Sequence, residues 1–422
     1  MMRPLRFVVI GLGGYGLVHI DAVRWLAGKG SARLTGVVAL EVDRETHPDM
    51  VRTLESEDVA LYDNIEHFMS AGIGNCDILT VPIGIHLHVP VSVAAMKAGL
   101  DVYCEKPAAG TVQEVDALIE AQQQTGRLVA IGFQHIYSHS IQELKKRVSD
   151  GRLGGVKRLT LMCGWPRSKQ YYSRNEWAGR LRRDNHWILD SPANNANAHY
   201  VMNALYLCSE DARRAATPDR VRAELYRANK IESPDTIQLQ FSAPGGVEGH
   251  IILSHAGGRE QTPQMHIVCE KGRAYWQSDE GRTLVRYDNG TTEEFSNTVD
   301  ERWRYNGFKD LIAAVQEERA PLCTPDVARP QTVVINAMHE SCPRVVEVPS
   351  EFVSEAEDWE MFPPETRGVF RKIHNLDEYT RVAIAEGEMF SALGVPWAKP
   401  VESILFAVGD YRSFPSKPSR FE

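Results

Sequence analysis

The chain has 422 residues, which at about 150 residues per domain predicts two or three domains with cores of their own. Hydrophobic residues make up 43% of the chain and charged residues 24%, a globular composition that excludes a disordered or fibrous protein. The formal net charge of -9 argues against nucleic acid or an anionic membrane surface as a partner. A small neutral or polar ligand suits this charge better.

The cysteines and the start of the chain indicate a cellular compartment. The seven cysteines form no C-x-x-C pair and their number is odd, so we expect neither a disulfide framework nor a cysteine-rich zinc site. The chain begins at Met1 and runs into an apolar strand without the pattern of a signal peptide. No apolar run of about 18 residues occurs. We therefore expect a cytoplasmic protein without a membrane-spanning segment.

Short apolar runs rich in β-branched residues alternate with helical patterns as far as about residue 135. A helix is expected over residues 112–124, and strands are expected over residues 6–10, 33–41, 77–81, 101–104 and 127–133. Because strands and helices alternate, the sequence predicts an α/β domain with a doubly wound parallel sheet over residues 1–135.

The pattern changes after residue 135. Helices are expected over residues 141–149, 303–317 and 330–341, with a further helix that ends near residue 208. Strands are expected over residues 156–162, 219–227, 235–242, 247–255 and 264–269. These elements predict an α+β domain with an open, mostly antiparallel sheet over residues 136–350. Residues 351–422 are expected to form a C-terminal extension packed on that domain.

A glycine-rich motif, G-x-G-x-x-G, follows the first expected strand and comprises Gly11, Gly13, Gly14, Tyr15 and Gly16. In such a motif the first glycine permits a tight turn, the second lets the backbone approach a pyrophosphate, and the third lets helix and strand pack closely. The N-terminus of the following helix supplies N–H groups and positive potential. The motif therefore predicts dinucleotide binding in a Rossmann domain, and a glycine-rich turn without a ligand is the alternative.

Glu41 is expected to end the second strand, 25 residues beyond Gly16. An acid at this position accepts hydrogen bonds from the hydroxyls of the adenosine ribose, and it would repel a 2′-phosphate. The sequence therefore favours NAD over NADP, with nearby Arg44 as the group that could accommodate NADP. A solvated acid at a strand end is the alternative.

Lys106 lies in the segment Glu105-Lys106-Pro107, directly after the expected strand 101–104. Ligands gather at the carboxyl ends of the strands in a doubly wound sheet, so Lys106 is expected beside the nicotinamide end of the cofactor. The glycine motif, Glu41 and this segment resemble the Gfo/Idh/MocA family of oxidoreductases. The resemblance covers residues 5 to about 345, and it extends to Thr80-Val81-Pro82, His88 at a helix start, Ala98-Gly99, a G-x-I-G-x-V pattern at residues 151–156 and an N-x-W pattern at residues 175–177.

The resemblance carries expectations about activity and assembly. Most characterised members of the family use a nicotinamide cofactor to oxidise or reduce a secondary alcohol of a sugar or cyclitol. Their Rossmann domain precedes an open-sheet domain that covers the cofactor and often forms oligomer contacts. We therefore expect a homo-oligomer, either a dimer or a tetramer. The resemblance further implies that the cofactor is contacted by Pro82, His88, Glu105 and Lys106.

The family's other catalytic element is a helix that carries Asp and, four residues later, His. Here His199 matches the histidine, and Asn195 stands where the aspartate is usual. Ser191 suits an N-cap and Pro192 the first helical position, so we expect Asn195 and His199 one turn apart on one helix face. In this arrangement His199 accepts the hydroxyl proton, Lys106 stabilises the oxyanion and Asn195 orients them. Asn lacks the charge that stabilises an imidazolium, which predicts a weaker base than in relatives with Asp.

Residues 169–177 combine hydroxyl groups with aromatic faces suited to a sugar ring, and an irregular packed loop is the alternative. We expect Tyr172, Asn175 and Trp177 to bind substrate together with Lys106, Asn195 and His199, and we expect no metal site. The sequence thus favours a dehydrogenase of a sugar, cyclitol or glycoside. Two alternatives are a redox-neutral enzyme that cleaves a glycoside by transient oxidation and elimination with a tightly held NAD, and a non-catalytic protein that binds NAD or sugar.

Overall fold

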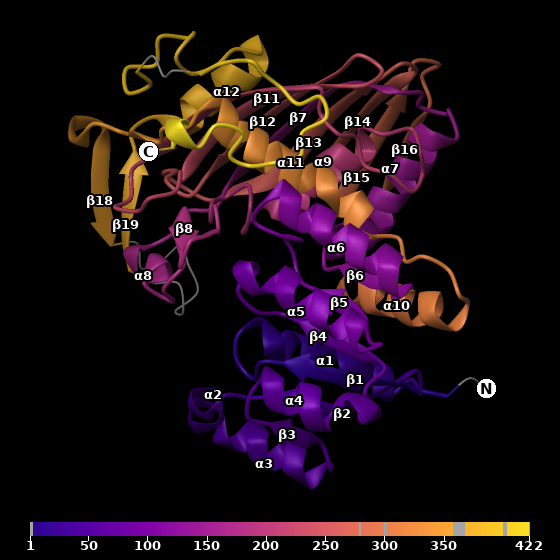
Figure 1. Ribbon diagram of the computed structural model, residues 1–422. Coiled ribbons are helices and arrows are strands. Elements are labelled where there is room, and N and C mark those ends of the chain that lie inside the picture. Colours follow the sequence, from indigo (N-terminus) through magenta and orange to yellow (C-terminus); the bar gives the residue numbers. More distant parts are fainter. Residues whose placement is uncertain are drawn as a thin grey trace. The chain divides into compact units, whose positions relative to one another are not determined.

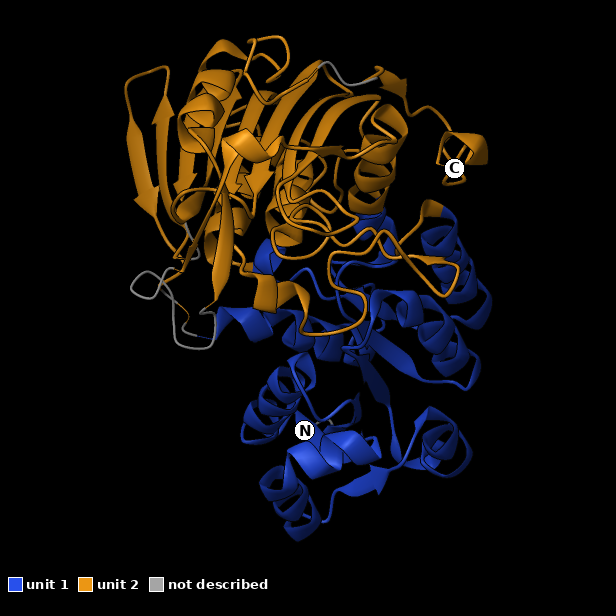
Figure 2. Ribbon diagram, turned by 90° about the vertical axis from the view of Figure 1, so that its left-hand side faces the viewer, with its two compact units in different colours: residues 1–109, 113–137, 302–329 blue, residues 110–112, 138–301, 330–422 orange. Residues whose placement is uncertain are grey.

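A computed structural model describes residues 3–277, 280–298, 300, 302–357, 368–399 and 403–421 (Figure 1). The chain divides into two compact units, coloured separately in Figure 2. Unit 1 comprises residues 1–109, 113–137 and 302–329, and unit 2 comprises residues 110–112, 138–301 and 330–422. The three consecutive ranges expected from the sequence differ from this division, because residues 302–329 group with the N-terminal unit.

Unit 1 is built on a six-stranded parallel sheet in the order β3-β2-β1-β4-β5-β6. Its strands are β1 (Leu5–Ile10), β2 (Ala32–Val38), β3 (Ala60–Tyr62), β4 (Ile78–Val81), β5 (Asp101–Cys104) and β6 (Val129–Ile131). The expected α/β fold with a doubly wound parallel sheet is confirmed. The strand order reverses between β1 and β4, and this switch point is where open α/β sheets bind their ligands, outside the carboxyl ends of the strands.

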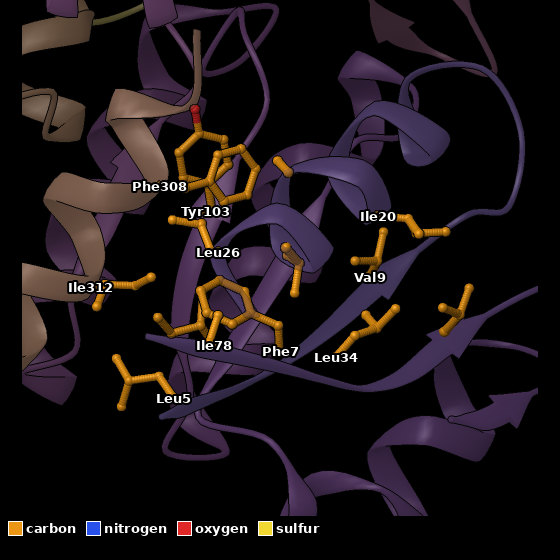
Figure 3. Packing of buried hydrophobic residues seen from close by; sticks show 14 of the residues in the cluster. Leu5, Phe7, Val9, Ile20, Leu26, Leu34, Ile78, Tyr103, Phe308 and Ile312 are labelled. Atoms are coloured by element: carbon orange, nitrogen blue, oxygen red, sulfur yellow. The ribbon is translucent and has the colours of Figure 1, made fainter. Parts of the chain in front are cut away.

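The helices of unit 1 connect successive strands. They are α1 (Tyr15–Ala27), α2 (Glu41–Thr46), α3 (Pro48–Ser56), α4 (Ile65–Ala71), α5 (Ile85–Lys97) and α6 (Val112–Thr125). A helix from much later in the sequence, α10 (Asn306–Gln316), also packs here. Its Phe308 ring stacks on Tyr103 of β5 with centroids 4.0 Å apart (Figure 3). This packing explains why residues 302–329 group with the N-terminal unit.

The core of unit 1 is a continuous apolar cluster in which Phe7 and Val9 of β1, Ile20 of α1 and Ile78 of β4 are almost fully buried (Figure 3). Strands covered on both faces have few polar positions, which is why β1 ends in the continuous apolar run 7–10 after Arg6. Each such side chain contributes about 1.5–3 kcal/mol on burial. The cluster therefore fixes the strand ends that carry the ligand-binding turns.

Unit 2 contains a ten-stranded sheet. Its path runs β16-β15-β14-β13-β7-β12-β11-β10-β17, with β20 pairing to β10. The pairs β7–β12, β10–β17 are parallel and the others are antiparallel, so the expected open, mostly antiparallel sheet is confirmed. The strands are β7 (Val156–Gly164), β10 (Arg220–Arg227), β11 (Thr236–Ala243), β12 (Val247–Ser254), β13 (Gln261–Cys269), β14 (Gly272–Gln277), β15 (Arg282–Tyr287), β16 (Thr292–Phe295), β17 (Val346–Glu347) and β20 (Phe406–Ala407).

Helices and two small sheets complete unit 2. The helices are α7 (His139–Ser149), α8 (Lys169–Tyr172), α9 (Ala198–Leu207) and α12 (Leu376–Glu386), and α11 (Pro325–Ser341) begins in unit 1 and continues into unit 2. Two-stranded sheets join β8 (Arg182–Arg183) to β9 (His186–Trp187) and β18 (Val353–Glu357) to β19 (Val369–Ile373). Every residue of α9 is buried, so this helix is a fixed part of the unit.

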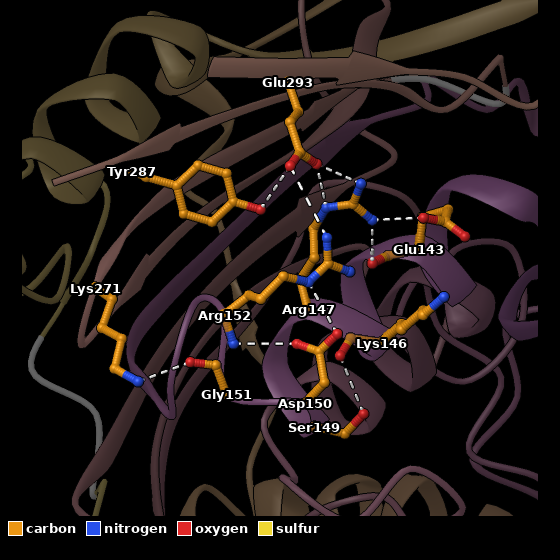
Figure 4. A network of polar contacts seen from close by, with 10 residues as sticks. All are labelled: Glu143, Lys146, Arg147, Ser149, Asp150, Gly151, Arg152, Lys271, Tyr287 and Glu293. Carbon is orange, nitrogen blue, oxygen red and sulfur yellow. Dashed lines mark hydrogen bonds and ion pairs between the residues drawn. The ribbon is translucent and has the colours of Figure 1, made fainter. Parts of the chain in front are cut away.

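Arg147 connects α7 to the far edge of the sheet (Figure 4). Its guanidinium is 2.6 Å from the Glu143 carboxylate on α7, and its Nε donates to Glu293 of β16 at 2.6 Å. The same group lies over the Phe295 ring, 4.6 Å from its centroid. Arg147 is buried, so these paired charges and the stacked ring hold β16 and α7 together.

The C-terminal extension packs on two parts of unit 2: its residues around Glu388 contact β11, and Tyr411 donates to the Glu340 carboxylate of α11 at 2.9 Å. The Gln238 side chain of β11 donates to the Glu388 carbonyl at 2.8 Å and accepts from the Phe390 N–H at 2.6 Å. Phe390 and Trp397 then pack around Tyr226 in a separate apolar cluster.

The described part of the chain contains no helix both long and apolar enough to cross a membrane.

Candidate functional site

The glycine-rich turn lies between β1 and α1 in unit 1. Gly11 has φ +94° and Gly14 has φ +51°, left-handed values that favour glycine. The Gly11 N–H donates to the Val38 carbonyl of β2 at 2.7 Å, which fixes the start of the turn. At the N-terminus of α1 no described side chain forms a capping hydrogen bond. The turn therefore presents helix N–H groups and positive potential, as a pyrophosphate site requires.

Gly13 and Gly16 play different roles in this turn. A Cβ at Gly16 would lie 2.4 Å from the Gly11 carbonyl oxygen, so only glycine allows α1 to pack this closely on the turn. A Cβ at Gly13 would meet nothing closer than the His47 ring at 3.5 Å. The space over Gly13 is open to a ligand, so the turn fits a dinucleotide.

Glu41 does not end a strand, contrary to the sequence prediction. β2 ends at Val38, and Glu41 is the first residue of α2. An acid in a first helical turn is stabilised by the helix dipole, which accounts for the helix start here. Within this helix the Asp43 carboxylate lies 3.7 Å from the Cβ position of Gly13. Asp43, which sequence reasoning missed, is therefore an acid that borders the glycine turn, and the ribose-binding role of Glu41 stays a prediction.

Arg44 follows on the same helix and is held by other groups. Its Nε donates to the Ala39 carbonyl at 3.0 Å, and its guanidinium pairs with Asp63 at 2.7 Å. To bind a 2′-phosphate, Arg44 would have to leave this ion pair.

Lys106 follows β5, and the carboxylate of its neighbour Glu105 fixes its backbone. Oε2 of Glu105 accepts from the Lys106 N–H at 3.0 Å, and Oε1 lies 3.1 Å from Nε2 of His19. Both His19 and Glu105 are buried. The Glu105 carboxylate thus fixes the backbone of Lys106. The contact of Lys106 with the cofactor stays a prediction.

His88 holds the other side of the same segment. Its Nδ1 lies 2.7 Å from the carbonyl oxygen of Pro107 and its Nε2 lies 3.0 Å from that of Ile83, which follows Pro82 at the end of β4. Burial lowers the pKa of His88. The contacts with the two carbonyl oxygens act in the opposite direction and raise the pKa, since both oxygens can accept only from a doubly protonated ring, and the ring lies between the segments that follow β4 and β5. Tyr15, another predicted cofactor residue, is exposed and its hydroxyl accepts from the Gln134 amide at 3.0 Å.

The helix predicted to carry both Asn195 and His199 begins later than expected. α9 starts at Ala198, and the residues before it form turns in which the Asn195 N–H donates to Ser191 O at 2.9 Å. Asn195 and His199 therefore do not share a helix face, and that prediction was wrong. Asparagine side chains compete with backbone groups for hydrogen bonds, and three of them at residues 194–197 favour turns over helix.

A carboxylate lies beside Asn195 after all, supplied by Asp190. The Asn195 amide donates to Asp190 Oδ1 at 2.8 Å, and the Gly179 N–H donates to Asp190 Oδ2 at 2.6 Å. Asp190 is buried, as is His199 at the start of α9. No sequence pattern pointed to this role of Asp190, because the contact is created by the conformation of the irregular turn that follows it.

The predicted substrate residues of unit 2 are partly brought together. Tyr172 and Asn175 both line a pocket of about 800 Å³, and the Tyr172 hydroxyl lies 3.2 Å from Nδ1 of His255. The Asn175 side-chain oxygen accepts from the N–H groups of Trp177 and Ala178, so it shapes the loop. The Trp177 ring instead lies beside the Arg174 guanidinium. Lys106 is in unit 1, whereas Asn195 and His199 are in unit 2.

A parallel sheet in this order, with a glycine-rich turn after its first strand, defines an NAD-binding Rossmann oxidoreductase. A model described as "Oxidoreductase family, NAD-binding Rossmann fold" matches residues 5–133, and one described as "GFO/IDH/MocA C-terminal domain" matches residues 141–275. The chain belongs to the Gfo/Idh/MocA family, as its motifs predicted.

Curated relatives include inositol 2-dehydrogenases. That of Azotobacter vinelandii is 25% identical over 248 residues, which are 56% of this chain and 68% of the relative. That of Salmonella paratyphi B is 28% identical over 145 residues, 34% of this chain and 42% of the relative. The chain thus spans less than half the length of several of these relatives.

Solved structures share the fold. The WlbA dehydrogenase from Bordetella pertussis in complex with NADH and UDP-GlcNAcA superimposes with a TM-score of 0.66 at 20% identity, over 80% of this chain and 96% of that one. The aldose-aldose oxidoreductase from Caulobacter crescentus complexed with glycerol gives a TM-score of 0.65 at 20% identity, over 80% and 97%.

Proposed function

We propose that this protein is an NAD-dependent dehydrogenase that oxidises a secondary alcohol of a sugar, cyclitol or related carbohydrate. The observation that carries the proposal is the position of Lys106. It follows β5 at the ligand-binding edge of an NAD-binding sheet, and Glu105 and His88 fix the backbone on both sides of it. The inositol, aldose and UDP-GlcNAcA names of the similar proteins support a carbohydrate substrate.

The chain's own residues supply the proton chemistry. NAD, held at the glycine-rich turn between β1 and α1, would supply the hydride acceptor. The Lys106 ammonium stabilises the negative charge that develops on the carbinol oxygen, and His199 accepts the hydroxyl proton. Asn195, whose amide is held by Asp190, orients these groups through its hydrogen bonds. In the direction of reduction the same residues act in reverse order.

NAD rather than NADP is the proposed cofactor. Glu41 and Asp43 place two carboxylates in the first turn of α2, and Arg44 is paired with Asp63. A 2′-phosphate beside these acids would meet like charge. Dissociation constants for the two cofactors test this, and equal or tighter NADP binding would reject it.

The function is tested by measuring NADH formation across a panel of monosaccharides, cyclitols and glycosides. Lys106→Ala should lower turnover on the best substrate by about 100-fold or more and should change NAD affinity little. Lys97→Ala is the matched control, because Lys97 is an exposed lysine of the same unit at the end of α5. A folded Lys106→Ala enzyme with normal turnover would remove Lys106 from the mechanism.

The same panel separates the redox-neutral alternative. A glycoside that is cleaved without net NADH, by protein that is purified with NAD bound, would replace net oxidation with transient oxidation.

A homo-oligomer, dimer or tetramer, is also proposed on the basis of family membership. Light scattering on the purified protein tests it, and a monomer at micromolar concentration would reject it.

A further inference from the structure

A group of basic and aromatic side chains gathers in unit 2 where β7 and β12 end. We call Arg167, Tyr171, Tyr172, Arg174 and His255 the arginine cluster. β7 and β12 are parallel neighbours, so their carboxyl ends lie at one edge of the sheet. Tyr171, Tyr172 and Arg174 lie in the segment 169–177 that the sequence predicts to suit a sugar ring, whereas Arg167 and His255 belong to no predicted site.

The backbone holds the cluster in place. Beyond the paired strands, the Trp165 N–H donates to Ser254 O at 2.9 Å and the Arg167 N–H donates to His255 O at 3.0 Å. The Tyr172 hydroxyl lies 3.2 Å from Nδ1 of His255, which connects α8 to the end of β12. Arg167 and His255 therefore stand on extensions of the sheet, where a binding group is positioned more rigidly than on a free loop.

Two guanidinium groups in the cluster lack an acidic partner. The Arg167 guanidinium lies 4.9 Å from the centroid of the Tyr171 ring, which belongs to α8. The Arg174 guanidinium lies 3.6 Å from the same centroid. Neither arginine forms an ion pair with the residues that the structure describes, and Nε of Arg167 is buried without a hydrogen-bond acceptor. By contrast, Arg180 and Arg183 farther along the loop pair with Glu232 and Glu176.

His255 adds a buried polar atom to these charges. Its side chain is only 3% exposed, and within the described part of the chain its Nε2 has no hydrogen-bond partner. Burial lowers the pKa of His255 well below its usual value, and Arg167 and Arg174 lower it further. A buried polar atom without a partner is costly, so a ligand oxygen or hydroxyl would complete this ring's hydrogen bonding.

Acidic groups near the cluster are already occupied. Asp190 and Asp235 act electrostatically on Tyr172, but each accepts hydrogen bonds from backbone N–H groups, those of Gly179 and of Ala228 and Asn229. Among the described residues, neither carboxylate forms an ion pair with Arg167 or Arg174. The two arginines thus present uncompensated positive charge in a chain whose net charge is -9.

We propose that the arginine cluster binds an anionic group of the substrate, so that the enzyme acts on a carbohydrate bearing a carboxylate or a phosphate. The planar guanidinium of Arg167 matches the oxygens of either group, and its position over the Tyr171 ring adds a cation–π contact. The Tyr172 hydroxyl and His255 share one hydrogen bond, so either the hydroxyl or Nε2 of His255 keeps a proton with which to donate a neutral hydrogen bond to the same ligand. The proposal rests on the dehydrogenase function above for its reaction and on the cluster alone for its ligand.

The test compares three probes that share one ring: D-glucose, D-glucuronate and D-glucose 6-phosphate. Their dissociation constants are measured by calorimetry on the wild-type chain saturated with NAD, and NADH formation is followed in parallel. We expect at least one acidic probe to bind about 10-fold or more tightly than glucose, and the preferred acid tells carboxylate from phosphate. Because the attraction is electrostatic, this preference should shrink as salt is raised.

Arg167→Gln should reduce the preference for the acidic probe by about 10- to 100-fold, the range for a lost hydrogen bond to a charged group. Arg167→Lys should restore part of it, because the charge returns without the planar fork. Arg183→Gln is the matched control, since it removes a loop arginine already paired with Glu176.

The outcomes separate this inference from the proposed function. Glucose bound as tightly as both acids, no binding of either acid, or an unchanged preference in folded Arg167→Gln would each overturn the anion site. Binding of an acid that depends on Arg167, with no NADH from any probe in the wider panel, would preserve the anion site and reject the dehydrogenase function.

Discussion

Replacing Gly13 with alanine should separate cofactor binding from folding. The φ of Gly13 is outside the left-handed region, and its added Cβ would lie 3.5 Å from His47 and 3.7 Å from Asp43, ordinary van der Waals distances. The fold should therefore keep its stability to within about 1 kcal/mol, since an alanine that fits without strain also restricts the unfolded chain. The same change at Gly16 would place a Cβ 2.4 Å from Gly11 O, and relieving that overlap costs about 1–3 kcal/mol.

The effect on NAD has the opposite order. The backbone at Gly13 is where a pyrophosphate approaches, so the alanine methyl group occupies space that the cofactor needs. An overlap that costs about 1–3 kcal/mol raises the dissociation constant of NAD by about 5- to 150-fold. Gly13→Ala should thus be stable and bind NAD poorly, whereas Gly16→Ala should be unstable.

Urea unfolding gives the stabilities, and calorimetric titration gives the NAD dissociation constants at a temperature where all variants are folded. Gly28→Ala serves as the control, because Gly28 follows α1 with a right-handed conformation and its Cβ would meet only carbonyls at 3.4 Å or beyond. Gly13→Ala with the NAD affinity of the wild type would refute the assignment of this turn to the pyrophosphate.

Three further predictions concern stability. Lys145 is buried and donates to the carbonyls of Tyr206, Ser209 and Arg214 at the end of α9, so Lys145→Met should lower the free energy of unfolding by about 2–5 kcal/mol; a loss below about 0.5 kcal/mol in urea unfolding would contradict this. Burial lowers the pKa of His339 to about 4 from an unfolded value near 6.5, so the unfolded state binds the proton first as the pH falls. The free energy of unfolding of the wild type should therefore fall by about 2 kcal/mol between pH 7.5 and 5 because of this histidine. His339→Gln should remove that share of the loss, and an unchanged pH dependence would show that His339 does not titrate as described. Asn195→Asp would put two carboxylates at the 2.8 Å contact with Asp190, so it should destabilise the fold by about 1–3 kcal/mol at neutral pH, and adding Asp190→Asn should recover it; additive losses in this cycle would refute the contact.

That last prediction changes what Asn195→Asp can reveal about His199. From the sequence alone, the new carboxylate is expected to raise the pKa of His199 and shift the acidic limb of the oxidation profile to higher pH. With Asp190 beside it, the new carboxylate would share a proton with Asp190 instead. The pH profile should therefore be measured in the Asp190→Asn, Asn195→Asp double variant, where one carboxylate is left to ionise.

Local patterns predicted most of the fold because the strands of unit 1 are buried on both faces. The observed bounds of β1 and β5 agree with the predicted ones to within one residue, since each strand contains an apolar run of at least three residues. β3 has only three residues and one of them is exposed, too few to form a pattern. The return of α10 to unit 1 depends on Phe308 stacking on Tyr103, a contact that no local pattern contains.

The positions of candidate site residues could be predicted where a sequence motif follows a strand. They could not be predicted where an irregular turn or a contact between distant segments places the residue. The glycine turn and Lys106 follow strands, so their positions could be deduced from strand order. The other contacts depend on features without a local pattern. Asp43 lies beside the glycine turn because α2 starts earlier than expected, and Asp190 contacts Asn195 through the asparagine-rich turn. His255 is placed by the pairing of β7 with β12. Each of these depends on hydrogen bonds between segments rather than on periodicity.

The central claim, hydride transfer from a carbinol carbon of a carbohydrate to NAD, is tested most directly by isotope transfer. The wild-type protein is incubated with NAD and with the best substrate of the panel, deuterated at its carbinol carbons, and the reduced nicotinamide is analysed by mass spectrometry. We expect one deuterium in the reduced cofactor, and we expect it to form more slowly in Lys106→Ala. Substrate conversion without deuterium in the reduced cofactor would contradict it.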